Sequence, residues 1–140
     1  VAAVTITLTA TLCALHLARP ATEDFRGAVG HALDAVAAAP SGEDVRVVSV
    51  EFQPPLFPQG QPYDYYAPRL TQSPPAREPM LAGGFSVADP AALLRADRVV
   101  VVNRSLPGDQ FLLRALGAEF GAPGSTPFGY GLDVLIYARR

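Results

Sequence analysis

The stretch Arg98-Val-Val-Val-Val-Asn103 (RVVVVN) decides how the rest of this 140-residue chain is interpreted. Its four consecutive valines are β-branched and apolar, and no polar residue alternates with them. A run of this kind predicts a strand that is covered on both faces, as strands of layered α/β domains are. Helices that cover the two faces are therefore expected in the sequence on either side of it.

Helical patterns precede and follow this strand. The preceding segment, SVADPAALLRAD, predicts a helix with Asp89 as its N-cap and Pro90 at its first helical position. The following segment, LPGDQFLLRALG, predicts a turn and then a short helix that begins after Asp109 and ends at Gly117. The buried side of this second helix is predicted to hold Leu112, Leu113 and Leu116.

The N-terminal half of the domain predicts one helix and one strand. Thr22 is a suitable N-cap, and Glu23 and Asp24 place negative charge on the first helical turn. Pro40-Ser41-Gly42 ends this helix, and VRVVSVEF (residues 45–52) then predicts a strand with apolar residues on both faces. The apolar face of the helix is formed by Phe25, Val29, Ala32 and Val36.

The C-terminus predicts a β-hairpin. Its first arm starts near Ala118, its loop is GAPGSTPFGYG (121–131), and its last arm is LDVLIYARR (132–140). Combined with the alternating helices and strands, this predicts an α/β layered domain over residues 20–140, with a partly parallel sheet and a C-terminal hairpin.

Residues 53–79 differ in composition from the rest of the domain. They contain eight of the chain's 14 prolines, which predicts a long loop with one short helical turn at Tyr63–Leu70. The segment YDYY places three tyrosines in four residues, and hydroxylated rings are suited to stacking on a sugar and hydrogen-bonding to it. Alternatively, Tyr65 and Tyr66 pack beneath the loop, and the sequence alone leaves both interpretations open.

The first 18 residues, VAAVTITLTATLCALHLA, contain no Asp, Glu, Lys or Arg. As a helix they would be about 27 Å long, close to the ~30 Å thickness of a bilayer's hydrocarbon core. This predicts a transmembrane helix over residues 1–19, cut short at its start, with Arg19-Pro20 marking where the chain leaves the membrane. A buried core helix or strand and a signal peptide are the alternatives.

Composition and motifs exclude several classes of function. The net charge of −2 and the lack of any Arg cluster argue against binding to nucleic acid. Cys13 is the only cysteine, so no internal disulfide and no cysteine-based metal site is expected. No phosphate-binding, hydrolase or metalloprotease motif occurs in the sequence, and no catalytic residue, metal ligand or cofactor site is predicted. Asn103-Arg104-Ser105 fits the N-glycosylation pattern, but it follows a buried strand and is not expected to be used.

Several segments, in this order, resemble the C-terminal end of a multi-span C-type glycosyltransferase, similar to the protein mannosyltransferase and lipid A aminoarabinose transferase group. The family's D-[WF]-R-x-A helix start is matched by Asp24, Phe25, Arg26 and Ala28. The family's G-D-x-V strand resembles Glu43-Asp44 with Val45 and Val47, although Glu43 stands where glycine is usual. Tyr65-Tyr66 match the family's YY segment, and ADRVVVVN and GLDVLIYARR follow in the expected order.

The resemblance implies that residues 20–140 form an extracytoplasmic domain that caps a membrane-embedded active site in a multi-pass cell-membrane protein. The family transfers a sugar from a polyprenyl-phosphate donor to a lipid, glycan or protein acceptor. Its catalytic acidic residue lies in an early loop outside this chain, and any metal site would lie there too. The implied partners are the donor lipid and the parent protein's remaining transmembrane helices. The residues expected to face the substrate cavity are Asp24, Arg26, Tyr65, Tyr66 and Arg69.

Two other functions fit the same sequence. The chain would be a non-enzymatic, single-span membrane-anchored binding or sensor domain if only a short basic stretch preceded it. It would be a soluble α/β protein if its first segment were part of the core.

Overall fold

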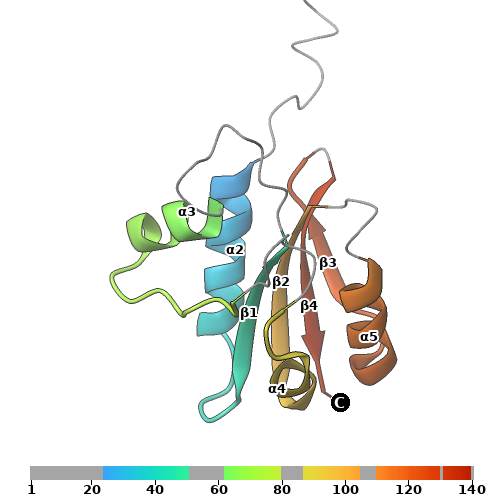
Figure 1. The fold of residues 1–140 in the computed structure, drawn as a ribbon. Coiled ribbons are helices and arrows are strands. Elements are labelled where there is room, and N and C mark those ends of the chain that lie inside the picture. The colour runs from blue at the N-terminus through green and yellow to red at the C-terminus, as the bar shows by residue number, and fades with distance from the viewer. Residues whose placement is uncertain (1–23, 51–61, 80–86, 105–109, 130, 140) are drawn as a thin grey trace, which may run out of the picture.

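The computed structural model describes residues 24–50, 62–79, 87–104, 110–129 and 131–139. They form a small α/β domain in which a mixed four-stranded sheet lies between helices on both of its faces (Figure 1). In chain order the elements are α2 (Phe25–Ala37), β1 (Val45–Val50), α3 (Pro62–Leu70), α4 (Pro90–Arg95), β2 (Arg98–Arg104), α5 (Gln110–Phe120), β3 (Gly124–Pro127) and β4 (Leu132–Ala138).

The strand order is β1-β2-β4-β3, so β2 lies inside the sheet. β1 pairs with β2 in parallel, with Val47 opposite Val100, and the other two pairings are antiparallel. The four valines of β2, residues 99–102, are completely buried. The predictions of a partly parallel sheet and of a fully covered central strand are therefore confirmed.

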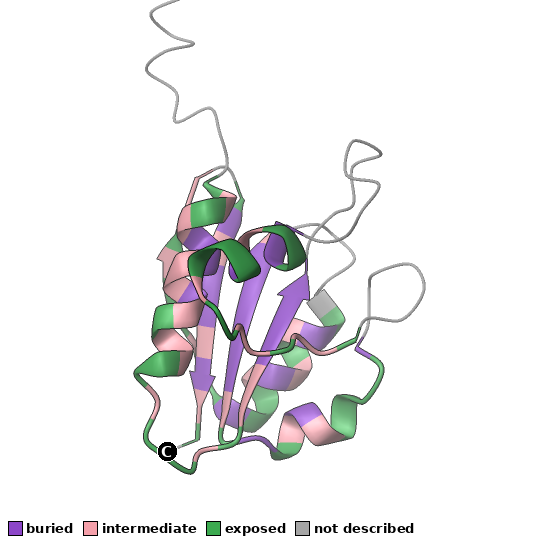
Figure 2. Ribbon diagram, turned by 90° about the vertical axis from the view of Figure 1, so that its left-hand side faces the viewer, coloured by how far each residue is buried: buried purple, intermediate pink, exposed green. Residues whose placement is uncertain are grey.

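Two hydrophobic layers form because successive side chains of a strand point to opposite faces of the sheet. α2 and α3 cover one face, where Val47, Val100 and Val102 lie, and the described elements α4 and α5 cover the other face, where Val48, Val99 and Val101 lie. The burial of the strands between these layers is visible in Figure 2. This is why both β1 and β2 are apolar without alternation.

The starts of two helices were predicted with different success. Asp89 caps α4 and accepts a hydrogen bond from the Ala92 amide at 2.9 Å, as predicted, with Pro90 next in the chain. The prediction of Thr22 as the cap of α2 is wrong. Asp24 is the N-cap instead of a first-turn residue, because its carboxylate reaches the Gly27 amide at 2.7 Å.

The C-terminal boundaries were also predicted incorrectly. α5 does not end at Gly117 but continues through Ala118 to Phe120, which is buried one turn beyond Leu116. The positive φ of 85° that ends the helix occurs at Gly121. The first arm of the hairpin is therefore β3, within the segment that was predicted to be its loop.

The helical turn predicted at Tyr63–Leu70 within the proline-rich segment is confirmed, and it is longer than expected: it is a nine-residue helix, α3 (Pro62–Leu70). Pro62 suits the first turn of a helix because its φ is already fixed. After α3 the chain returns to the free edge of β1, where the Glu78 amide donates to the Val47 carbonyl at 2.8 Å. This segment therefore covers an edge that would otherwise be open to another strand.

The predicted transmembrane helix of residues 1–19 lies outside the described residues. Within the described ranges, no helix has the length and apolar character needed to span a bilayer.

Candidate functional site

The candidate site is built on α3, which packs on α2. Tyr63 and Ala67 point inward from α3 and lie in one apolar cluster with Ala28, Val29 and Ala32 of α2. Tyr63 is only 3% exposed, and its hydroxyl donates to the Pro75 carbonyl at 3.0 Å. These contacts connect α3 to α2 and to the returning chain.

A second set of contacts fixes α3 from its exposed side. The Arg77 guanidinium makes two hydrogen bonds to the Asp64 carboxylate, Nε to Oδ1 at 2.8 Å and Nη2 to Oδ2 at 2.7 Å. Because Arg77 also lies beside Val47 at the edge of β1, this ion pair connects the helix with the sheet. α3 is thus held at both its inner and its outer side, although it is rich in proline.

α3 carries three of the five predicted cavity residues, and two of them, Tyr65 and Arg69, lie on its outward face. Tyr65 is 52% exposed, and its ring meets the Tyr66 ring edge-to-face, with the centroids 5.0 Å apart. The Arg69 guanidinium carbon lies 3.7 Å from the centroid of the Tyr65 ring, and Arg69 also donates to the Tyr65 carbonyl. Tyr66 is half-buried against the α2 layer, whereas Tyr65 does not pack beneath the loop. We call Tyr65, Tyr66 and Arg69 the α3 cluster.

The other two predicted cavity residues, Asp24 and Arg26, lie at the start of α2. The Asp24 carboxylate caps α2, and its amide donates to the Phe128 carbonyl at 3.0 Å. Arg26 is exposed on the first turn of α2. Among the described residues, no hydrogen bond or ion pair connects either residue to the α3 cluster. Asp24 therefore has a structural role that the family resemblance did not indicate.

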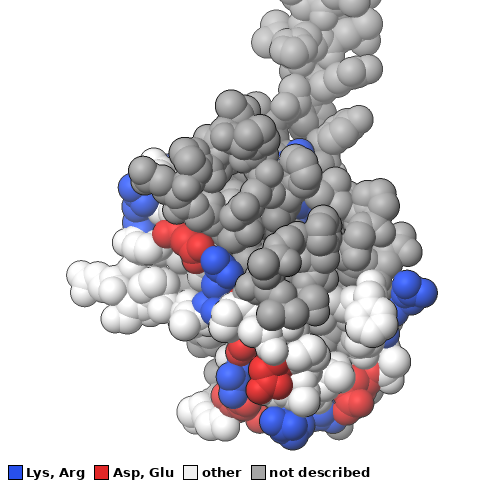
Figure 3. All heavy atoms as spheres, viewed as in Figure 1, with Lys and Arg blue, Asp and Glu red and all other residues white. Residues whose placement is uncertain are grey.

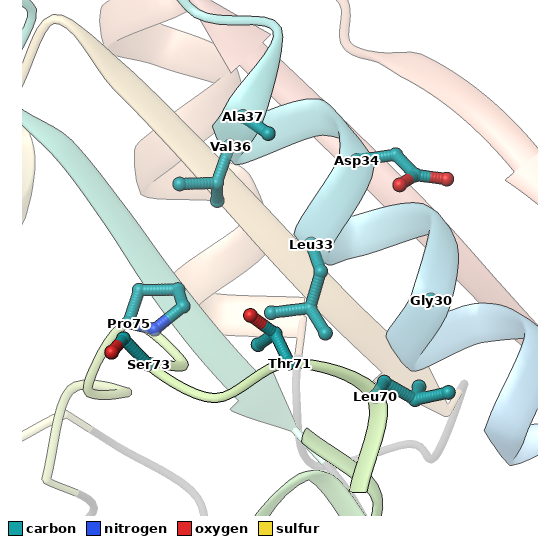
Figure 4. Close-up of a pocket in the computed structure, with 9 residues that line it drawn as sticks. All are labelled: Gly30, Leu33, Asp34, Val36, Ala37, Leu70, Thr71, Ser73 and Pro75. Atoms are coloured by element: carbon teal, nitrogen blue, oxygen red, sulfur yellow. The ribbon is translucent and has the colours of Figure 1, made fainter. Parts of the chain in front are cut away.

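An open groove of about 720 Å³ lies between α2 and the chain that follows α3. In Figure 4, Leu33 and Thr71 point toward each other across it, whereas Asp34 points away from it. Its walls are mainly apolar, with the hydroxyls of Thr71 and Ser73 as polar groups. The residues that line it are Gly30, Leu33, Asp34, Val36, Ala37, Leu70, Thr71, Ser73 and Pro75.

Charged side chains gather at the end of the domain opposite the start of α2 (Figure 3), where several of them form ion pairs. Arg46 binds Asp44 at 2.6 Å and Glu78 at 3.1 Å, and these hydrogen bonds, Asp44 first, raise the pKa of its guanidinium. Arg98 binds Glu43 at 3.0 Å. This network was not predicted from the sequence. The spacing of Asp44 and Arg46, which places both on one side of a strand, was the available signal.

Two further predictions concern metal binding and glycosylation. No group of three or more His, Cys, Asp or Glu side chains in the described ranges is placed to hold a metal ion. Asn103 is 2% exposed, and its amide donates to the Asp133 carboxylate at 2.8 Å, so the amide is not accessible to a glycan-transferring enzyme.

Comparisons with protein-family models, with curated proteins and with solved structures find no match. The interpretation of the α3 cluster consequently depends on its geometry and on the resemblance in the sequence.

The cap of α2 gives a first testable prediction. Asp24→Ala is expected to lower the free energy of unfolding by about 1 kcal/mol, because the Gly27 amide loses its acceptor. Asp24→Asn retains an acceptor and is expected to cost less. Urea unfolding of the two variants and the wild type measures the difference, and an unchanged stability of Asp24→Ala would show that the carboxylate does not cap α2.

Tyr63 gives a second prediction, on alkaline stability. Burial, followed by the nearby Asp64 carboxylate, raises the pKa of Tyr63 from 10.0 to about 12. A raised folded-state pKa means that the stabilisation is fully present below pH 10 and is lost as the pH rises toward 12, because the unfolded chain releases the proton first. The loss from Tyr63 is expected to reach about 2–3 kcal/mol.

Urea unfolding at about pH 8 and about pH 11.5 tests this sign and size. Tyr63→Phe is expected to be less stable than wild type at the lower pH, because the Pro75 carbonyl loses its donor, but to lose less stability on going to the higher pH. Tyr137, whose pKa is also raised by burial, contributes a remaining alkaline loss in both proteins. Equal alkaline losses in the two proteins would contradict the prediction.

Proposed function

We propose that this chain is the C-terminal part of a polyprenyl-phosphate-dependent membrane glycosyltransferase. In this proposal residues 1–19 form its last transmembrane helix, and residues 20–140 form an extracytoplasmic domain that caps the substrate cavity. The observation that carries the proposal is the packing of α3 on α2. Two segments that resemble the family, the start of α2 and Tyr65-Tyr66, thereby belong to one layer, on the domain's side nearest Asp24 (Figure 1).

The third segment that resembles the family supports the same proposal. Asp44 directly precedes β1 and Val47 lies within it, and the edge of this strand receives the chain that returns from α3. The three motifs therefore cooperate in building one substructure, α2-β1-α3, and do not lie scattered over the domain. This substructure carries the α3 cluster, which presents an aromatic hydroxyl and a guanidinium to the solvent. Such groups bind and orient phosphate or hydroxyl groups, so the domain's role is binding and positioning.

The test is sugar transfer by membranes that contain the full-length gene product, supplied with a radiolabelled polyprenyl-phosphate sugar. Tyr65→Ala and Tyr66→Ala are expected to lower transfer roughly 2- to 10-fold, the range that corresponds to about 0.5–1.5 kcal/mol per aromatic contact. Tyr65→Phe, which removes only the hydroxyl, is expected to lower transfer by less than Tyr65→Ala does. Phe111→Ala, an exposed aromatic on the opposite layer, is the matched control and should transfer like wild type.

Two results would count against the proposal. Wild-type transfer in every tyrosine variant would remove the role of the α3 cluster. No transfer by membranes that contain the wild-type protein would instead favour the single-span, non-enzymatic binding domain.

A further inference from the structure

We infer that the outer face of α3, formed by Tyr65 and Arg69 and flanked by the half-buried Tyr66, lies against the headgroup layer of an anionic membrane. The inference deepens the proposed function, on which it rests, by naming the partner of the α3 cluster. The partner is the phosphate-bearing headgroup region of anionic phospholipids.

Chain length brings the domain close to the membrane surface. Five residues, 19–23, separate the uncharged run from Asp24. Even fully extended, this connection reaches about 20 Å. The headgroup region on each side of a bilayer is about 5–7 Å thick. In the proposed arrangement, the start of the domain therefore stays within about 20 Å of the end of the membrane helix, and one of its sides faces the headgroups.

The exposed apolar residues indicate which side this is. α3 packs beside the N-terminal half of α2, where the domain begins (Figure 1). Among the described residues, exposed large hydrophobic side chains are Tyr65, Leu70 and Phe111, and two of these three belong to α3. Tyrosine is enriched at membrane–water interfaces because its ring is apolar and its hydroxyl is polar.

The distribution of ion pairs indicates an anionic partner. Arg46, Arg77 and Arg98 each bind a carboxylate. Arg26, Arg69 and Arg95 pair with no carboxylate among the residues that the structure describes. The first two lie on the side where α2 begins, so their charges remain available to lipid phosphates there. An arginine near an anionic bilayer contributes about 1 kcal/mol to binding, an attraction that salt weakens.

The geometry of the cluster favours lipid over a stacked sugar. The Arg69 guanidinium already covers one face of the Tyr65 ring, and Tyr66 meets this ring edge-to-face. A sugar would compete with these contacts for the ring. Lipid contact does not require a free ring face, since the exposed part of Tyr65 and the guanidinium of Arg69 lie on the same side of α3.

Fluorescence can test the contact because the chain contains no tryptophan. The full 140-residue chain, carrying Tyr65→Trp, is reconstituted into vesicles of phosphatidylcholine alone or mixed with phosphatidylglycerol. Some of the lipids carry bromine near the headgroup end of their acyl chains. The matched control is Ser41→Trp, at an exposed turn on the far end of α2. Urea unfolding first confirms that both variants are as stable as the wild type.

The expected result has three parts. The protein floats with the vesicles, brominated lipids quench the fluorescence of Tyr65→Trp but not that of Ser41→Trp, and the quenching is stronger in phosphatidylglycerol vesicles. Adding Arg69→Ala to Tyr65→Trp should lower the equilibrium constant for lipid contact roughly five-fold, because about 1 kcal/mol of attraction is lost. Arg95→Ala, which removes an exposed arginine of α4, should leave quenching unchanged.

Each contrary outcome has a distinct meaning. Flotation with no quenching of Tyr65→Trp, or with equal quenching of Tyr65→Trp and Ser41→Trp, overturns the lipid contact and leaves the membrane anchor intact. No flotation overturns both the anchor and the contact. Protection of Tyr65→Trp fluorescence from acrylamide by a soluble sugar phosphate, but not by vesicles, would assign the face to the sugar donor and overturn the lipid contact.

Discussion

Replacing Leu116 by alanine is expected to lower the free energy of unfolding by about 2–5 kcal/mol. Leu116 is completely buried on α5, in the same apolar cluster as Val101 and Leu135 of the sheet. Truncation removes the buried methyl groups and leaves a cavity in a layer whose strands cannot move to fill it. The expected observation is a lower urea midpoint with an unchanged dependence on urea concentration, because the surface exposed on unfolding is nearly the same.

Phe111 on the same helix provides the control. Its side chain is 76% exposed, so Phe111→Ala is expected to change stability by no more than about 0.5 kcal/mol. Both substitutions are on α5 and both introduce alanine, but only Leu116 is buried. Similar effects would mean that α5 does not cover the sheet through Leu116, and the two-layer arrangement around β2 would be wrong.

The central part of this fold could be predicted from the sequence because burial on both faces leaves a strong local pattern. The side chains of Val99–Val102 are all removed from water only if the strand is covered on both faces. Asp89-Pro90 marks the start of a helix through local chemistry alone. β1 followed from the same reasoning, and its two faces do contribute to different hydrophobic layers.

The boundaries of the C-terminal elements could not be predicted because they depend on distant residues. Gly117 and Gly121 are equally good local helix ends, and the burial of Phe120, whose ring meets Tyr137 of β4, extends α5 to the later glycine. β3 has the sequence GSTP, in which no apolar pattern exists. It is a strand because β4 offers it hydrogen-bonding partners.

The candidate site was predicted in part. The sequence identified the tyrosines but treated them as one aromatic group, because it did not establish a helix. Once α3 is a helix, its period places Tyr63 and Ala67 inward and Tyr65 and Arg69 outward, four residues apart on one face. The role of Asp24 as a cap was also missed, since both Thr22 and Asp24 are good capping residues and only the helical geometry distinguishes them.

Tyr63→Ala is the second substitution expected to have a large effect, about 3–5 kcal/mol if α3 unfolds together with the rest of the domain. The ring of Tyr63 is buried against α2, and its hydroxyl donates to Pro75, so alanine removes packing and leaves a carbonyl without its donor. A smaller loss in urea unfolding, accompanied by fast hydrogen exchange in residues 62–70, would mean that α3 detaches locally while the sheet stays folded.

Tyr65→Ala separates packing from function on the same helix. Because Tyr65 is half exposed and outside the α2 layer, its truncation is expected to change the free energy of unfolding by no more than about 0.5–1 kcal/mol, including the lost contact with Arg69. Both substitutions should abolish the exposed α3 cluster, Tyr63→Ala by displacing the helix and Tyr65→Ala by removing its central ring. Loss of transfer in both variants, with loss of stability in Tyr63→Ala alone, would locate the function on the outer face of α3. Loss of transfer in Tyr63→Ala alone would show that the helix matters to the fold and that its outer face does not matter to the reaction.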